Sequence, residues 1–333
     1  MQDTGHSAFR GADIAIGLKG IAYFVGKSVP IDELSCLANN PGLLERFKAE
    51  YFRNFSRSDI SLPEQAALAA HQTLRKCNIQ AGDIDAVVIG FSELSEWTDH
   101  PEQLTRAILS RLGMNRIPAA GVTLSGCANA ASALRAARNM VIAEGYRNVL
   151  VVETNLLRDD DRRLLGTQPG ATPENVFGDG AVSFIVTSDI NTADFDLLAM
   201  NQIVSFAEGE QITMQDEIAT STAAARHVIE RALDHAGLTR EQINCLLLNN
   251  MNFKIMATLM RMYGFSKVDF FIENALNHGH VWSADPFMNL NDYCRKNAPP
   301  DGTLFMLLTY GRNNFFALIL RKRRPAGGAA PAD

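Results

Sequence analysis

Apolar and polar positions along the chain follow two alternating patterns. Short apolar runs bounded by turn residues predict β-strands over residues 14–24, 86–91, 121–124, 148–153, 181–186, 245–248, 304–309 and 315–320. Apolar residues that recur three and four positions apart predict helices over residues 63–77, 102–112, 128–143, 215–236, 253–263 and 286–296. Because strands and helices alternate, this order predicts βαβ units and an α/β fold.

One part of this pattern occurs twice. Residues 79–90 (IQAGDIDAVVIG) and 238–249 (LTREQINCLLLN) each contain a helix end, then an isoleucine, then an apolar strand. The same spacing carries Cys127 onto Pro286, beside Asp285 at the start of another predicted helix. Duplication of one unit explains the repeat, and it would bring the starts of both helices to one pocket. Chance similarity between two amphipathic βα units is the alternative.

Under duplication the chain divides into two halves and a tail. The halves are residues 1–190 and residues 191–322, and the second is shorter because it lacks most of a loop like 155–176. The tail, residues 323–333, is basic at first and then rich in Pro, Ala and Gly. Such a composition cannot build a core, so we expect the tail to be disordered.

Composition limits the classes of function. The 333 residues suffice for one large domain or two ordinary ones. With 31 Lys plus Arg against 37 Asp plus Glu, the formal net charge of −6 makes nucleic acid a poor candidate as a partner. No apolar run approaches the ~20 residues of a membrane span, and no secretory signal is visible, so we expect a cytoplasmic protein. The 5 cysteines are scattered, which argues against a disulfide scaffold or a zinc ribbon.

Cys127 follows a predicted strand and opens a predicted helix, in the stretch TLSGCANAASALRAA at residues 123–137. Free N–H groups and the helix dipole at such a position favour the thiolate, the nucleophilic form of cysteine. A buried cysteine can also be a small apolar side chain. The Gly-Cys junction between strand and helix favours the nucleophile, whereas the other four cysteines lie in ordinary apolar patterns and are interpreted as packing.

A base and a carboxylate suited to this nucleophile occur together in residues 277–289 (NHGHVWSADPFMN). A catalytic cysteine needs a base, and the base needs a group that orients it. His278 and His280 flank a glycine, and Asp285 precedes Pro286, which favours the first position of a helix. Asp285 is therefore suited to cap that helix, to orient a histidine or to do both. The choice between the two histidines is open, and a metal-binding pair is the other interpretation, although it has no convincing third ligand.

These residues resemble the thiolase superfamily, specifically the β-ketoacyl-ACP synthase III type. The resemblance rests on GIAYFV at residues 20–25, SGCANA at 125–130, VFGDGA at 176–181, the block 277–290 and TYGRNNFF at 309–316. It implies a thiolase-like, five-layered α-β-α-β-α fold with two duplicated halves. It also implies a homodimer that acts on an acyl-thioester substrate, with no tightly bound cofactor and no metal.

Two positions depart from the pattern of the condensing enzymes. Those enzymes carry His-Gln-Ala-Asn after the first strand of the second half, and that histidine helps to decarboxylate malonyl-ACP. Here the stretch reads NNMN at 249–252, so Asn249 replaces the histidine. The family's asparagine in Gly-Asn-Thr-Ser is replaced by His280. Because asparagine cannot act as a general base, decarboxylative carbon–carbon condensation is in doubt.

The pattern Gly-His-x-x-x-x-Asp-Pro instead resembles a divergent branch of acyltransferases from polyketide and other natural-product pathways. That resemblance implies a triad of Cys127, His280 and Asp285, which moves an acyl group from acyl-CoA or an acyl carrier protein to a hydroxyl, amine or thiol. The family's end loop survives as Gly311 and Arg312, and the amides of Cys127 and Arg312 would stabilise the oxyanion.

The remaining predicted contacts are to the substrate. Asn249 and Asn252 would bind the acyl carbonyl or the small-molecule acceptor. The loop 155–176 carries Arg158, Arg162 and Arg163, which would contact the phosphates of CoA or phosphopantetheine; a plain solvated surface is the alternative.

Three rival functions are weighed against acyl transfer. The first is a condensing enzyme with His280 as the only base. The second is a non-catalytic subunit of a heterodimeric synthase, against which the joint presence of cysteine, histidine and aspartate argues. A cysteine hydrolase of unrelated fold would use the same residue types, but it would explain neither the FGDGA motif nor the repeat. The sequence does not specify the acyl group or the acceptor.

Overall fold

A mixed sheet of ten strands forms the frame of the molecule in the computed structural model, which describes residues 14–92, 100–207, 213–265, 268–311 and 313–323. Most neighbouring strands are antiparallel, and four pairs near the two edges are parallel. In spatial order the strands are β12 (Asp269–Phe270), β11 (Cys245–Leu248), β13 (Leu304–Gly311), β14 (Asn314–Lys322), β10 (Phe195–Val204), β1 (Gly17–Val25), β9 (Gly180–Thr187), β6 (Asn148–Asn155), β4 (Ala86–Gly90) and β5 (Ala119–Val122). Two small sheets pair β2 (Lys27–Pro30) with β3 (Asn54–Arg57) and β7 (Leu164–Leu165) with β8 (Asn175–Val176).

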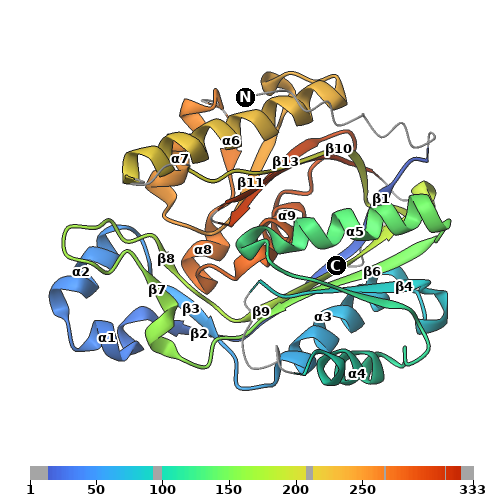
Figure 1. Ribbon diagram of the computed structural model, residues 1–333, viewed down its shortest axis with the longest axis horizontal. Helices are drawn as coiled ribbons and strands as arrows, with labels where there is room; N and C mark the ends of the chain where they lie inside the picture. Colours follow the sequence, from blue (N-terminus) through green and yellow to red (C-terminus); the bar gives the residue numbers. More distant parts are fainter. Residues whose placement is uncertain (1–13, 93–99, 208–212, 266–267, 312, 324–333) are drawn as a thin grey trace.

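Helices cover both faces of this sheet and also separate its two parts. They are α1 (Ser35–Ala38), α2 (Pro41–Ala49), α3 (Leu62–Cys77), α4 (Pro101–Leu112), α5 (Asn129–Glu144), α6 (Met214–Ala236), α7 (Phe253–Met262), α8 (Glu273–His278) and α9 (Asp285–Asn297). In Figure 1, α6 and α7 lie above β10, β11 and β13; α5 and α9 lie between these strands and β4, β6 and β9; α3 and α4 lie below. The five α-β-α-β-α layers that the resemblance implied are confirmed. None of the helices in the described residues is long and apolar enough to cross a bilayer.

The buried face of α5, in the middle layer, is built largely from small residues. Ala130, Ala131, Ala133 and Ala137 have no exposed surface and lie in one apolar cluster with strands from both parts of the sheet. Small side chains let a helix lie close to a sheet at the high packing density of protein interiors. On the α9 side, Phe287 stacks on a phenylalanine of β9 with ring centroids 4.7 Å apart.

The first turns of these two helices meet. The turn η3 (Gly126–Ala128) precedes α5, the turn η7 (Trp282–Ala284) precedes α9, and the two turns contact each other. The sequence repeat predicted this meeting of the two helix starts. The repeated segments also match locally: the turns η2 (Ala81–Asp83) and η6 (Arg240–Gln242) both carry a capping box and lead into β4 and β11.

Every strand and helix predicted from the apolar pattern coincides with an observed element, with ends shifted by a few residues. The main omission is β10, where the apolar pattern predicted no element. Its register shifts between Leu197 and Ala199, and much of the strand is only half-buried, so no clean alternation of apolar and polar residues marks it.

The division of the chain at residue 190 stays a prediction, and the predicted disordered tail needs one correction. Arg323, its first residue, is held in place: its N–H donates to Asp194 O over 2.8 Å, and its guanidinium donates to Asp196 over 2.9 Å. The backbone bond extends the pairing of β14 with β10 by one residue. Residues 324–333 lie outside the described residues.

The FGDGA motif forms a buried ion pair, which corrects the expectation for Arg163. Its guanidinium is 1% exposed and donates to both oxygens of Asp179, over 3.1 and 2.9 Å. The same carboxylate accepts the backbone N–H groups of Ser58 and Leu157, each over 2.9 Å. Arg163 therefore fixes the loop 155–176 to the start of β9 and is not available to a phosphate.

We expect Arg163→Met to lower the free energy of unfolding by about 3 kcal/mol, because it leaves the Asp179 carboxylate buried without its cation. Arg158→Met is the matched control: Arg158 is exposed in the same loop, and its replacement should change stability by less than about 0.5 kcal/mol. Urea unfolding followed by circular dichroism measures both variants. Equal midpoints for the two would contradict the structural role of Arg163.

Candidate active site

Cys127 lies in the turn η3, directly ahead of α5. The sequence predicted that it opens the helix, whereas the structure begins α5 at Asn129. Gly126 allows the turn because it adopts a left-handed backbone with φ of 53°, which side chains disfavour. Gly311 lies against the same turn, and a Cβ there would overlap the Cys127 amide nitrogen. Glycine at position 311 therefore lets the end of β13 reach the backbone of the nucleophile.

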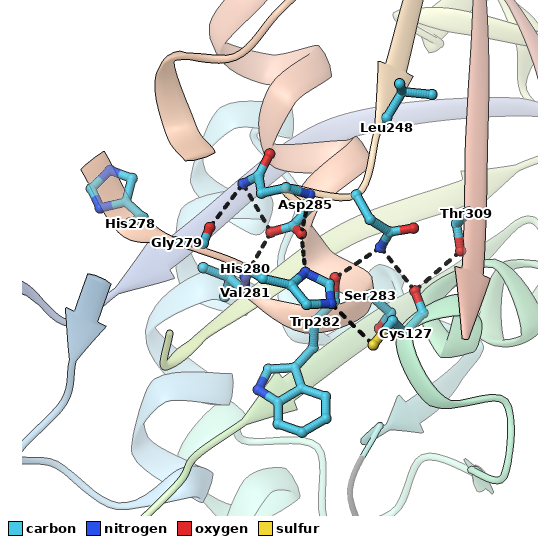
Figure 2. Close-up of polar contacts among 12 residues, drawn as sticks. Cys127, Leu248, His278, Gly279, His280, Val281, Trp282, Ser283, Asp285 and Thr309 are labelled. Carbon is cyan, nitrogen blue, oxygen red and sulfur yellow. Dashed lines mark hydrogen bonds and ion pairs between the residues drawn. The ribbon is translucent and has the colours of Figure 1, made fainter. Parts of the chain in front are cut away.

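His280 faces Cys127 from the second half of the chain, as Figure 2 shows. Its Nε2 lies 3.0 Å from Cys127 Sγ, and its Nδ1 contacts Asp285 Oδ2. The VFGDGA stretch holds the histidine backbone: His280 N–H donates to Val176 O over 2.8 Å, and Gly178 N–H donates to His280 O over 2.9 Å. The three residues of the predicted triad therefore form one continuous chain of contacts.

Asp285 is wholly buried at the first position of α9. The sequence analysis allowed it to cap this helix, but the cap position belongs to Ala284, and the carboxylate turns towards the loop before it. Oδ1 accepts Val281 N–H over 2.7 Å and Asn250 Nδ2 over 3.0 Å, and Oδ2 accepts Asn250 N–H over 2.7 Å. Three donors fix the carboxylate, and the carboxylate in turn fixes the plane of the imidazole.

Asn250 is a site residue that the sequence analysis missed. Both its backbone and its side chain hold Asp285. Its Oδ1 accepts from Asn289 Nδ2 over 2.9 Å, and Asn289 also donates to Leu248 O over 2.9 Å. The sequence signal for it is a pair of asparagines directly after an apolar strand.

Asn249 acts on the backbone, which corrects its predicted contact with substrate. Its Nδ2 donates to Cys127 O over 3.1 Å and to Trp282 O over 3.2 Å, and its Oδ1 accepts Tyr310 N–H over 3.0 Å. Thr309 Oγ1 donates to the same Cys127 oxygen over 3.1 Å. With both amide hydrogens engaged, Asn249 clamps together the nucleophile turn, the histidine loop and β13.

The structure does not bring Asn252 to the triad. Its Oδ1 caps α7 by accepting the N–H groups of Lys254 and Ile255, over 3.0 and 3.2 Å. Its Nδ2 donates to Pro173 O over 2.8 Å and to Glu50 over 3.1 Å. These four bonds give Asn252 a structural role instead of the predicted contact with the acceptor.

Charge is concentrated at the cysteine–histidine pair. Burial opposes a positive imidazole at His280, but the neighbouring Cys127 and Asp285 outweigh it and raise the pKa of His280 to about 10. His280 therefore keeps its proton at neutral pH. Both ring nitrogens then carry a proton, and Nε2 lies 3.0 Å from the sulfur.

His278, the other candidate base, lies at the end of α8 and is drawn well away from Cys127 in Figure 2. Its Nδ1 is buried without a hydrogen-bond partner, and burial lowers the pKa of its ring. Among the described residues no group of three His, Cys, Asp or Glu side chains could hold a metal ion. The geometry thus places His280, and not His278, beside the sulfur.

The predicted phosphate contacts lie at the surface. Arg158 and Arg162 are both exposed, near the turn η4 (Asp160–Arg163). The loop is less basic than expected, because Asp159, Asp160 and Asp161 stand between the two arginines. Arg312, the predicted oxyanion donor, lies outside the described residues.

Comparison with known families matches the C-terminal part of the chain. Residues 233–321 match the family model described as "3-Oxoacyl-[acyl-carrier-protein (ACP)] synthase III C terminal". A curated relative, the β-ketoacyl-[acyl-carrier-protein] synthase III of Microcystis aeruginosa, is 27% identical over 230 residues. That alignment covers 61% of this chain and 66% of the relative, just under two thirds of the relative's length.

Solved structures share the fold across nearly the whole chain. ChlB3, named as an acyltransferase, is 19% identical with a TM-score of 0.77 and covers 94% of this chain and 99% of its own. The 3-oxoacyl-[acyl-carrier-protein] synthase III of Aquifex aeolicus is 16% identical with a TM-score of 0.73, covering 92% of this chain and 99% of its own. The relatives by sequence and by fold agree with the resemblance found in the sequence motifs. Residues 233–321 thus match the C-terminal family of the synthases III, and the chain is distantly related to these synthases and shares their fold and that of an acyltransferase.

Proposed function

We propose that this protein is an acyltransferase. It moves an acyl group from a CoA or carrier-protein thioester, through an acyl-enzyme on Cys127, to a hydroxyl, amine or thiol acceptor. The observation that carries the proposal is the chain of contacts from Cys127 Sγ through both ring nitrogens of His280 to Asp285. A nucleophile within reach of a base, which is itself oriented by a third group, is the arrangement that covalent catalysis requires.

In the first half-reaction the Cys127 thiolate attacks the thioester carbonyl. The predicted oxyanion donors are the amides of Cys127 and Arg312, and the position of Gly311 against the Cys127 amide supports this pairing. As the intermediate collapses, the bond between the acyl carbon and the donor sulfur breaks. His280 gives its proton to the leaving thiolate, so an acyl-cysteine and a neutral imidazole remain.

The second half-reaction follows from the loss of charge on the sulfur. The thiolate charge of Cys127 is one of the causes that hold the proton on His280 against burial. Once the sulfur is acylated, burial favours the neutral ring, which can then accept a proton from the acceptor. The acceptor atom bonds to the acyl carbon, the bond to Cys127 breaks, and the starting ion pair is restored.

The hydrogen bonds that Asn249 already makes to the backbone favour acyl transfer over condensation. Decarboxylation of a malonyl donor develops negative charge on an enolate oxygen, which needs hydrogen-bond donors aimed at it. Both hydrogens of Asn249 already bond the backbone oxygens of Cys127 and Trp282. A condensing reaction would therefore depend on His280 alone.

The finer features of the proposal rest on the family resemblance. We infer that Arg158 and Arg162 contact the phosphates of CoA or of the carrier protein's phosphopantetheine, because both are exposed on one loop. A homodimer and a natural-product acceptor are proposed on the same basis. The alternative of a non-catalytic subunit is disfavoured, because His280 contacts both Cys127 and Asp285.

Mixing the protein with a panel of acyl-CoAs should add one acyl group to the native chain and none to Cys127→Ala. His280→Ala should react on the order of 100-fold more slowly, because it lacks the positive charge that favours the thiolate and the proton for the leaving sulfur. Intact-protein mass spectrometry with time resolves both effects. Equal labelling of native protein and Cys127→Ala would place the acyl group elsewhere and contradict the proposal. A lack of any adduct, from acyl-CoAs and from acyl carrier proteins alike, would favour the non-catalytic subunit.

Acyl transfer and condensation differ in the bond that the second half-reaction forms. Pre-acylated protein mixed with small alcohols, amines and thiols should release esters, amides or thioesters. Mixed with malonyl-CoA, it should release no carbon–carbon coupled product above that of Cys127→Ala. Coupled product from the malonyl donor, identified by mass spectrometry, would establish the condensing enzyme instead.

The proton on His280 should make stability depend on pH. The pKa rises from 6.5 to about 10 on folding, so this proton stabilises the folded chain fully below pH 6.5, and the effect is lost as pH rises through 10. We expect the difference in unfolding free energy between native protein and His280→Asn to shrink over this window, by at most about 1.4 kcal/mol per pH unit. Urea unfolding near pH 6, 8 and 10 measures it. A difference that stays constant, or that grows with pH, would contradict a raised pKa.

A further inference from the structure

Glu153 has a wholly buried side chain in β6. Four neutral groups donate to its carboxylate: Ser283 Oγ over 2.8 Å, Ser92 Oγ over 2.9 Å, Asn129 Nδ2 over 3.0 Å and Asn155 Nδ2 over 3.2 Å. The proposed reaction assigns no role to this carboxylate.

Two of the donors belong to the segments that carry the triad. Asn129 is the first residue of α5, next to the turn that holds Cys127. Ser283 lies in η7, on the stretch of chain between His280 and Asp285. Both of these segments therefore bond to one carboxylate, Asn129 through Oε2 and Ser283 through Oε1.

Burial of the Glu153 carboxylate is unfavourable in free energy, which argues against a role in packing alone. Burial raises the pKa of its carboxyl to about 6, although all four donors pull in the opposite direction. A buried carboxylate without a cation loses more hydration than an amide or an apolar side chain of the same size. The backbone of β4 also makes room for it, because a Cβ at Gly90 would overlap a carboxylate oxygen.

We propose that Glu153 is a positioning residue for acyl transfer, which sets the distance between the Cys127 turn and the His280–Asp285 loop by bonding Asn129 and Ser283 at once. It acts on the geometry in which His280 Nε2 meets Cys127 Sγ, a contact of 3.0 Å. A displacement of about 1 Å in such a contact lowers a rate on the order of 100-fold. The inference rests on the proposed function for its effect on acyl transfer, but the reactivity of Cys127 can be measured without any acyl donor.

The test is the alkylation of Cys127 by iodoacetamide, followed by mass spectrometry of the peptide that contains it. Glu153→Gln keeps the shape of the side chain but directs an NH₂ group at donors. We expect at least about tenfold slower alkylation of Cys127 and about tenfold slower acylation at saturating acyl-CoA, with the half-saturating acyl-CoA concentration changed less than about twofold. The control is Thr187→Val, which removes a buried bond of 3.0 Å to Asn148 at the far end of β6. It should lower the melting temperature and leave the alkylation rate unchanged.

Ser283→Ala provides a second variant, which decides the matter if Glu153→Gln does not fold. It removes one donor of Glu153 without placing a new group there, and it should slow alkylation of Cys127 as well. In the double variant the two reductions in alkylation rate should not multiply, because both substitutions disrupt the same hydrogen bond between Glu153 and Ser283.

Three results would overturn the inference. The first is a native alkylation rate in folded Glu153→Gln, or in Ser283→Ala if the former does not fold. The second is an equal slowing in Thr187→Val, since the rate would then follow stability. The third is a rise in half-saturating acyl-CoA concentration with an unchanged saturating rate, which is the result expected of a donor-binding residue. If native Cys127 is alkylated rapidly and Glu153→Gln slowly, while no thioester acylates the native chain, the proposed function fails and the positioning role stands.

Discussion

The first turns of α5 and α9 meet between the two parts of the sheet, and the active site depends on that meeting. The two helices lie between the two parts of the sheet, where the small side chains of α5 pack against the strands. Their starts bring Cys127 and Asp285 into one region, although the two residues are far apart in sequence. The loop before α9 then carries His280 back towards the sulfur, where the VFGDGA stretch holds its backbone. Two segments that are distant in the sequence thus make a site that neither contains alone.

Inside this site, two neighbouring asparagines hold other groups in place; the sequence predicted a substrate contact for Asn249 and no role for Asn250. Asn249 holds the backbone of the nucleophile turn, and Asn250 holds the carboxylate that orients the base. An amide suits both tasks, because it donates and accepts hydrogen bonds without exchanging a proton with the group that it holds. The base itself sits at His280, the position where the condensing enzymes of the family carry an asparagine. Relative to the pattern of those enzymes, histidine and asparagine have exchanged places, and the proposed change from condensation to acyl transfer rests on this exchange.

The sequence predicted the fold, and it predicted three residues that the structure brings into contact, because strong local patterns mark both. Apolar periodicity located the long elements, the Gly-Cys junction marked the turn before α5, and the Asp-Pro junction marked the start of α9. Contacts made across the fold carried no such pattern. Arg163 lies among other arginines in the sequence, yet its partner Asp179 belongs to another element. Glu153 reads as one polar residue in an apolar strand, and only the packed structure shows that Asn129 and Ser283 converge on it.

The proposed mechanism depends on one change in protonation: negative charge on the sulfur holds the proton on His280, and acylation of the sulfur releases it. A ¹⁵N NMR titration of the His280 ring, before and after alkylation of Cys127 with iodoacetamide, observes this exchange directly. In the free protein the ring should titrate near pH 10. After alkylation, with the sulfur neutral and the ring still buried, its pKa should fall clearly below that value. The same pKa in both forms would contradict the coupling between the sulfur and the base.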